Sequence, residues 1–168
     1  MPDLATNAPS ILPATAGDSD AIWAILEPVI RAGETWALDR DMSRAAALAY
    51  WFAADRQPFV SVENDEILGS YFIRANHPGP GAHIANAGYM TAQSAQGRGV
   101  GRAMCAHSLD LARTRGFRAM QFNFVVSTNT RAIALWQAMG FGEIGRTPGG
   151  FDHPRHGPVD SLMMFRKL

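Results

Sequence analysis

The chain has 168 residues, of which 47% are hydrophobic and 18% are charged, and its formal net charge at pH 7 is zero. This size and composition predict one globular domain with its own core, not a disordered chain. A neutral chain without a basic stripe gives no support for a nucleic acid or an anionic membrane as a partner. The single cysteine, Cys105, excludes an internal disulfide and a cysteine zinc cluster.

Residues 1–9 are predicted to form a flexible N-terminal tail, and residues 10–168 to form a single domain. The N-terminus lacks the basic start and apolar run of a signal peptide, and no apolar segment approaches the length of a membrane span. We therefore expect a cytoplasmic protein.

The predicted elements alternate between helices and strands in a fixed order. They are a strand at 10–14, a helix that begins near Asp18 or Asp20, a helix at 43–53 capped by Ser43, strands at 58–63, 67–74 and 82–91, a helix that ends near 115, a strand at 119–125, a helix capped by Ser127 or Thr128 that ends at Gly140, and closing strands at 143–147 and 159–166. The short turn between 58–63 and 67–74 makes that pair antiparallel. Pro28 predicts a kink or a break of the first helix near Glu27.

The most informative segment is the glycine-rich loop at 96–101, Gln-Gly-Arg-Gly-Val-Gly, between a predicted strand and a predicted helix. Glycine lets the backbone approach a ligand closely and adopt a positive φ. A helix N-terminus offers unpaired N–H groups to an anion. The segment therefore predicts a pyrophosphate site, with Arg98 and Arg102 adding charge at its rim.

Three phosphate-binding patterns compete for this loop. A Walker P-loop requires a Lys-Ser or Lys-Thr pair, and the only lysine is Lys167. A dinucleotide fingerprint requires a third glycine where Arg102 stands. The third pattern, Gln96-x-x-Gly99-x-Gly101, fits at every position.

This third pattern resembles the acyl-CoA loop of the GCN5-related N-acetyltransferases, the GNAT superfamily. A downstream segment resembles the same family's helix at five positions: Asn129, Ala132, Leu135, Gly140 and Phe141. The resemblance implies an α/β (α+β) GNAT fold, in which a mixed, mostly antiparallel central sheet carries helices on both faces. It also implies that the strands at 82–91 and 119–125 splay apart, with a bulge near Gly88.

The resemblance implies acetyl-CoA as a co-substrate and no metal. It places the main chain of Thr91, with Met90 beside it, against the pantetheine arm. The cofactor-binding residues that follow are Met90, Thr91, Gln96, Gly97, Arg98, Gly99, Val100, Gly101, Arg102 and Asn129.

The family's usual tyrosine, which protonates the leaving thiolate, is replaced by Trp136. An indole N–H donates a hydrogen bond but does not titrate usefully, so we expect Trp136 to hydrogen-bond or stack near the sulfur of CoA and not to supply a proton. Tyr89 is a conceivable substitute, and the alternative is a packed tyrosine whose hydroxyl lies at the surface.

Two asparagines, Asn86 and Asn123, lie on the splaying strands, although asparagine is depleted in strands. Each could satisfy a gap or bulge in the backbone, or both could line the acceptor pocket. Their surroundings are similar to those in a GNAT subgroup that acetylates proline analogues such as azetidine-2-carboxylate, in which matching asparagines contact the substrate.

Glu34 is the candidate general base, since it follows the first helix, where GNAT acceptor pockets are built. The alternative is an exposed loop carboxylate. The segment 152–156 contains His-x-x-His without further supporting ligands, and we expect no metal there; Arg155 or His156 could instead contact an acidic acceptor. We expect Cys105 to be a buried, inert thiol.

The sequence thus predicts an acetyl-CoA-dependent N-acetyltransferase that acts on the amine of a small molecule or amino acid by direct attack in a ternary complex. An acyl-CoA-binding regulatory module and a protein N-terminal or lysine acetyltransferase are the alternatives. We expect no nucleic acid or membrane partner, and we leave a homodimer open.

Overall fold

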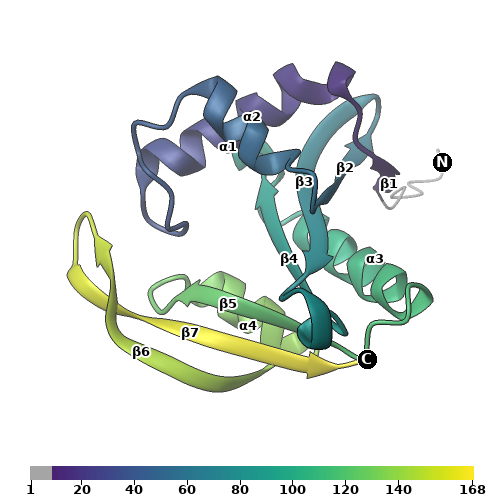
Figure 1. The fold of residues 1–168 in the computed structure, drawn as a ribbon. Coiled ribbons are helices and arrows are strands. Elements are labelled where there is room, and N and C mark those ends of the chain that lie inside the picture. Colours follow the sequence, from purple (N-terminus) through teal and green to yellow (C-terminus); the bar gives the residue numbers. More distant parts are fainter. Residues whose placement is uncertain (1–8) are drawn as a thin grey trace, which may run out of the picture.

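Seven strands form one sheet in the order β1-β2-β3-β4-β5-β7-β6, as the computed structural model shows for residues 9–168 (Figure 1). The strands are β1 (Ser10–Pro13), β2 (Gln57–Glu63), β3 (Glu66–Ala75), β4 (Ile84–Thr91), β5 (Ala119–Val126), β6 (Gly142–His153) and β7 (Gly157–Lys167). Neighbouring strands are antiparallel except β4 and β5, which are parallel. The predicted mixed, mostly antiparallel sheet is confirmed.

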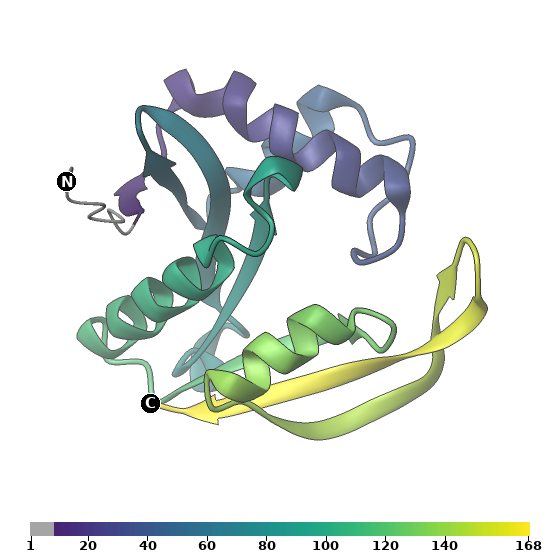
Figure 2. The same cartoon turned by 180° about the vertical axis from the view of Figure 1, so that it is seen from behind.

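Helices cover both faces of this sheet. They are α1 (Ser19–Ala32), α2 (Arg44–Trp51), α3 (Val100–Thr114) and α4 (Thr130–Ala138). The helices α1 and α2 pack on one side of β3 and β4, whereas α3 packs on the other side and α4 lies along β5 and β7 (Figures 1 and 2). No helix in the described residues is long and apolar enough to cross a membrane. The predicted tail lies outside the described residues, apart from Pro9.

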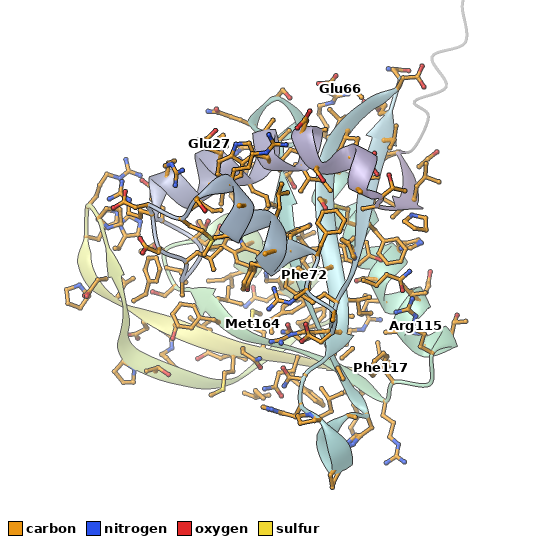
Figure 3. All side chains as sticks on the ribbon, turned by 45° about the horizontal axis from the view of Figure 1, so that its top comes forward. Glu27, Glu66, Phe72, Arg115, Phe117 and Met164 are labelled. Atoms are coloured by element: carbon orange, nitrogen blue, oxygen red, sulfur yellow. The ribbon has the colours of Figure 1, made fainter. Side chains whose placement is uncertain are left out.

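The core consists of two apolar clusters, one on each side of the sheet. The α1 face Ile22, Ile25, Leu26 and Ile30 packs with Trp51 and Phe72 in one cluster. The second cluster lies between α3, α4 and the sheet and includes Met104, Met120 and Met164. Figure 3 draws the described side chains and labels Phe72 and Met164, which are 3% and 0% exposed. Burial of both helix faces fixes where the strands between them lie.

The parallel pair β4–β5 separates soon after it begins, as the family resemblance implies. Only Ile84↔Ala119 and Ala85↔Met120 are paired. In contrast, β3 stays paired with β4 from Ala75 to Gly69. The opening therefore lies between β4 and β5 beyond Ala85, and it creates room inside the sheet itself.

The predicted bulge near Gly88 is wrong for the β3–β4 pair. Gly88 pairs with Phe72 without a register shift, and the irregularity lies in β5, between Phe122 and Val125. Gly88 has another reason to be glycine. A Cβ there would lie 2.5 Å from Cη2 of Trp36 and 2.9 Å from Cζ of Phe72, so a larger residue would push the Trp36 ring away from the strand.

The predicted helix boundaries agree with the structure at α2 and need correction at α4 and α1. Ser43 caps α2 as predicted, because its side chain accepts a hydrogen bond from the Ala46 N–H. The cap of α4 is Asn129, not Ser127 or Thr128, and its side chain accepts from the Ala132 N–H. The predicted break near Glu27 is also wrong, since α1 runs through Pro28 to Ala32. Packing of the α1 face outweighs the one backbone hydrogen bond that proline removes.

The last two strands are longer than predicted. The segment 148–158, between the two predicted closing strands, is mostly strand, because β6 extends to His153 and β7 begins at Gly157. The resulting hairpin curves toward the loop between α1 and α2 (Figure 1). The two parts are joined by an ion pair between Arg155 and Glu34, with 2.9 Å between Nη2 and Oε1.

Candidate active site

Two adjoining cavities occupy the opening between β4 and β5. One, the aromatic cavity, has a volume of about 300 Å³ and the other, the glycine-loop cavity, about 420 Å³. Both are lined by Thr35, Trp36, Tyr89, Asn129, Ala132 and Trp136. Two molecules bound side by side could therefore meet near Tyr89 and Trp136.

The floor of the glycine-loop cavity is the start of α3. The first backbone bond of this helix runs from the Ala103 N–H to the Gly99 carbonyl, so the N–H groups of Val100, Gly101 and Arg102 belong to the unpaired first turn. Gly97 and Gly99 have φ of +78° and +81°, which other residues rarely adopt. The loop thus directs free N–H groups at a cavity, the arrangement that binds anions.

The structure brings the predicted cofactor residues together, with one exception. The glycine-loop cavity is lined by Met90, Thr91, Gln96, Gly97, Gly99, Val100, Gly101, Arg102 and Asn129. Arg98 does not line it; its guanidinium pairs instead with Glu63 at the end of β2. The expectation that the Arg98 side chain adds charge at the rim is therefore corrected.

Arg131, which the sequence analysis missed, supplies charge on the opposite wall. It lies in the first turn of α4 and lines the glycine-loop cavity. Its Nη1 donates to Oε1 of Gln96 at 3.2 Å, so it also ties α4 to the loop. The sequence signal that could have indicated Arg131 is its position two residues after the matched Asn129.

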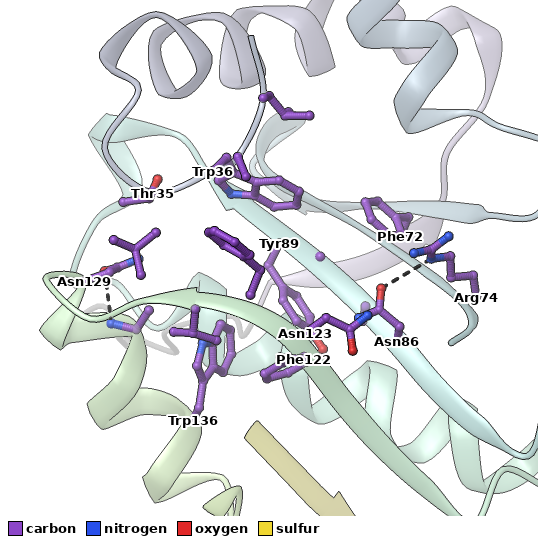
Figure 4. Close-up of a pocket in the computed structure, with 18 of the residues that line it drawn as sticks. Thr35, Trp36, Phe72, Arg74, Asn86, Tyr89, Phe122, Asn123, Asn129 and Trp136 are labelled. Carbon is purple, nitrogen blue, oxygen red and sulfur yellow. Dashed lines mark hydrogen bonds between the residues drawn. The ribbon is translucent and has the colours of Figure 1, made fainter. Parts of the chain in front are cut away.

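Seven aromatic side chains are among the residues that line the other cavity, most of them drawn in Figure 4. Trp36, Phe72, Phe122 and Phe124 line it together with Tyr50. The Trp36 ring reaches over β4 at Gly88, and Phe124 is 40% exposed although it is large and apolar. Such a surface favours a partly apolar small molecule.

Asn86 lies where the β4–β5 ladder stops. Its Nδ2 donates to the Gln121 carbonyl at 2.9 Å, which links the two strands one residue beyond their last backbone pair. Its Oδ1 accepts from Nε of Arg74 at 3.4 Å (Figure 4). Asn86 is 8% exposed and lines the aromatic cavity, so it both fills the backbone gap and faces the open space.

Asn123 lies beside Asn86 in the same wall (Figure 4). Its Nδ2 donates to Oδ1 of Asn76 at 2.7 Å, and its Oδ1 accepts from Nε2 of Gln121 at 3.1 Å. The side chain is exposed, in contrast to that of Asn86. The structure thus brings the two predicted asparagines together at one end of the aromatic cavity.

Tyr89 and Trp136 pack against each other between the two cavities, with tilted rings and 5.1 Å between ring centroids. The Tyr89 hydroxyl lies 2.7 Å from Oγ of the fully buried Ser108 on α3. It is neither at the surface nor directed into the cleft, and burial raises its pKa well above the ordinary value. Trp136 lines both cavities and is 9% exposed.

Glu34 occupies the rim and not the interior. Its neighbours Thr35 and Trp36 line both cavities, whereas its own carboxylate is held by Arg155 from the β6–β7 hairpin. An ion-paired carboxylate at the rim is poorly placed to take a proton inside the cleft. In this structure Glu34 therefore makes a contact that joins two loops, and it does not line either cavity.

Cys105 is buried, as predicted, with no exposed surface. Burial raises the pKa of its thiol to about 12. A thiol is nucleophilic only as the thiolate. Cys105 therefore packs into the core from the buried face of α3 and is not placed for covalent chemistry.

A sheet that opens between two parallel strands, next to a glycine loop and a helix N-terminus, defines a class of small α+β domains with a cleft for two ligands. Within that class, residues 23–141 match the acetyltransferase (GNAT) family, and the chain belongs to this family.

Relatives of known name agree with this placement. The chain is 30% identical over 132 residues to N-acetyltransferase aca1 of Schizosaccharomyces pombe, a match that covers 69% of this chain and 63% of that protein. The chain thus spans slightly less than two thirds of that relative. It is 42% identical to a GCN5-related N-acetyltransferase from Kribbella flavida, with a TM-score of 0.92 over 98% of this chain and 100% of the other.

A more distant structure shares the fold. It is the phosphinothricin acetyltransferase of Sinorhizobium meliloti in complex with AcCoA, with 20% identity and a TM-score of 0.83 over 96% of this chain and 89% of the other.

Proposed function

We propose that this chain is an acetyl-CoA-dependent N-acetyltransferase that acts on the amine of a small molecule or amino acid. The observation that carries the proposal is the pair of cavities that meet at Tyr89 and Trp136. One has free N–H groups and arginines suited to a pyrophosphate, and the other has aromatic walls suited to a small acceptor. Bringing two reactants together in this way can contribute about 7–11 kcal/mol to catalysis.

Acetyl-CoA would place its pyrophosphate on the first turn of α3, between Gly97 and Arg102, with Arg131 facing it. The pantetheine arm would then run along the end of β4, past Thr91 and Met90, toward the opening. Support comes from the bound AcCoA named for the Sinorhizobium meliloti protein, which has the same fold.

The chemistry is direct transfer. The neutral acceptor nitrogen attacks the thioester carbonyl carbon and the C–S bond breaks. The nitrogen gives up one proton to solvent, and the CoA thiolate leaves and takes up one proton from solvent. The α-amino group of a peptide has a pKa of about 7.7–8.0, and the amine of a free amino acid is more basic, so most acceptor molecules carry an ammonium at pH 8 and lose a proton before attack. With Glu34 at the rim and the Tyr89 hydroxyl turned inward, we assign the uptake of that proton to water.

The acceptor is proposed to be small, with proline analogues such as azetidine-2-carboxylate as the first candidates. The aromatic cavity of about 300 Å³ fits an amino acid better than a polypeptide. The ion pair of Glu34 with Arg155 joins the α1–α2 loop, which carries Thr35 and Trp36 of the cavity wall, to the β6–β7 hairpin. Asn86 and Asn123 supply polar groups at one end of the cavity.

The test is incubation with acetyl-CoA and a panel of amino acids, simple amines and short peptides, with release of free thiol as the readout. Thiol release with amino acids but not peptides is the expected result. Transfer to peptides alone would shift the acceptor to protein N-termini or lysines, against the proposal.

One observation favours the alternative of an acyl-CoA-binding module. Trp136 replaces the expected tyrosine, and the nearby phenol of Tyr89 is turned toward Ser108. Such a module would gain thermal stability from CoA and would release no thiol with any amine on the panel.

A first prediction concerns Cys105. We expect Cys105→Ala to retain turnover, because the thiol is buried and its pKa is raised to about 12. The loss of stability should be about 1 kcal/mol, typical of a small change in the core. Steady-state kinetics and a denaturation curve measure both.

The same reasoning predicts that the native thiol does not react with a disulfide reagent at pH 8 until the protein unfolds. Mass spectrometry of the enzyme quenched during turnover should find no acetyl group on Cys105. A trapped acetyl-cysteine, or loss of turnover in a folded Cys105→Ala variant, would contradict direct transfer.

A further inference from the structure

Arg74 is a cation on the wall of the aromatic cavity that the proposed chemistry has not used. It lies on β3 directly opposite Asn86 on β4. Among the described residues that line this cavity it is the one charged side chain; the others are apolar, aromatic or neutral polar. Its side chain is 28% exposed, so water solvates the guanidinium only in part. A partly desolvated cation on the wall of a cavity favours an anionic partner.

The hydrogen bonds of Arg74 leave one edge of the guanidinium available. Nη1 donates to Oδ2 of Asp55 at 3.1 Å, and Nε makes the long contact of 3.4 Å with Oδ1 of Asn86. Within residues 9–168, no hydrogen bond engages Nη2. Asp55 thus holds the guanidinium by one corner, and the edge formed by Nε and Nη2 is free for a bidentate contact once the weak Asn86 contact gives way.

Asp55 pairs with both Arg74 and Arg56, at 3.1 and 3.5 Å, so its one carboxylate does not neutralise both guanidinium groups. Its side chain is 58% exposed and does not line the aromatic cavity. Its pKa is lowered, chiefly by the hydrogen bond from Arg74, so it remains a carboxylate at neutral pH and keeps its hold on Nη1. Asp55 therefore orients the guanidinium of Arg74 through Nη1, and the Nε–Nη2 edge lies on the other side of that group.

We propose that Arg74 binds the carboxylate of the acceptor, so that the substrate class is a small amine with a carboxylate and an apolar body. The carboxylate would sit on the Nε–Nη2 edge, with Trp36 and Phe72 against the apolar body (Figure 4). This inference rests on the proposed acetyl transfer at the same cleft. It adds that the acid group, and not only the amine, is recognised.

The experiment compares acids with their carboxamides. Binding of L-proline, L-azetidine-2-carboxylate and L-methionine to the CoA-bound protein is measured by calorimetry, each beside its amide. We expect the acid of at least one pair to bind about 10- to 150-fold more tightly, the range for a hydrogen-bonded charge. Arg74→Met should remove this preference and leave amide binding unchanged. Arg74→Lys should restore part of it, since lysine keeps the charge but not the fork.

Arg113→Met is the matched control. Arg113 lies on α3, pairs with Asp110 and lines neither cavity. The Arg113→Met variant should keep the preference for acids over amides. Melting temperatures verify that each variant folds.

Different results would overturn the role of Arg74 and the proposed acetyl transfer. Equal binding of acid and amide in every pair, no binding of any acid, or equal loss of both in Arg74→Met would overturn the role of Arg74. A clear acid preference without thiol release from acetyl-CoA would support Arg74 as a carboxylate site and overturn the acetyltransferase proposal instead.

Discussion

Replacing Gly99 with tryptophan is expected to abolish CoA binding. Among residues 9–168, apart from the residues next to Gly99 in the chain, no heavy atom lies within 4 Å of the position that a Cβ would take at Gly99, and this glycine lines the glycine-loop cavity. An indole would therefore occupy the space where the proposed pyrophosphate meets the first turn of α3. Losing two or more hydrogen bonds to a charged group costs at least about 3 kcal/mol, or more than about 100-fold in affinity.

Gly101→Trp should act in the same way from inside the helix. Its Cβ would lie 3.3 Å from Cδ2 of Leu135, so the larger ring has to turn toward the cavity or displace α4. Calorimetric titration with CoA measures both variants.

Gly116→Trp is the control for backbone strain. Gly116 has the same φ of +81° as Gly99 and equally open surroundings, but it lies at the far end of α3. It should lose stability to the same degree and keep its affinity for CoA. Unchanged CoA affinity in both Gly99→Trp and Gly101→Trp would remove the proposed cofactor site.

The glycine loop could be predicted from the sequence because its function is local. Positive φ at Gly97 and Gly99 and the free N–H groups of the next helical turn depend only on residues within a short stretch. The opening between β4 and β5 was different. Nothing in the spacing of either strand shows that pairing ends at Ala85 and Met120, and only the family resemblance implied it.

Side-chain partners far apart in the sequence could not be predicted. Arg98 was expected at the cofactor because it lies within the loop, yet Glu63, 35 residues earlier, pairs with it. Glu34 was expected inside the cleft, yet Arg155 holds it at the rim. In each case an ion pair formed across the fold decides where a long or charged side chain points, and local spacing carries no information about it.

Arg74 is a residue whose candidate role in the site could not be predicted from the sequence. As the last residue of a predicted strand it resembles an ordinary solvated end. Its importance arises only because β4 places Asn86 opposite it and the aromatic cavity beside it. A charge becomes a candidate recognition group through the apolar surroundings that tertiary packing supplies.

The second prediction with a large expected effect concerns Asn86 and Asn123. Both line the aromatic cavity, but their side chains make different structural contacts. If both contact the acceptor, Asn86→Leu and Asn123→Leu should each lower kcat/KM for the acceptor by about 5- to 150-fold, the cost of an unpaired polar group in a closed site. CoA affinity should be unchanged in both, since neither side chain lines the glycine-loop cavity.

Stability should separate the two variants. Asn86 is 8% exposed and bonds the Gln121 carbonyl across the strand gap, so its loss should cost about 1–3 kcal/mol of unfolding free energy. Asn123 is exposed, so water can replace its partners and the cost should stay below about 0.5 kcal/mol. Denaturation curves and acceptor kinetics on the same preparations measure both effects.

The decisive comparison is therefore Asn123→Leu, in which a loss of acceptor turnover is not explained by a loss of stability. A stable Asn123→Leu variant with the acceptor KM and kcat of the unmodified protein would leave that asparagine with only its contacts to Asn76 and Gln121. A loss in Asn86→Leu that affects acceptor and CoA equally would mean that this residue maintains the strand opening and does not contact the acceptor.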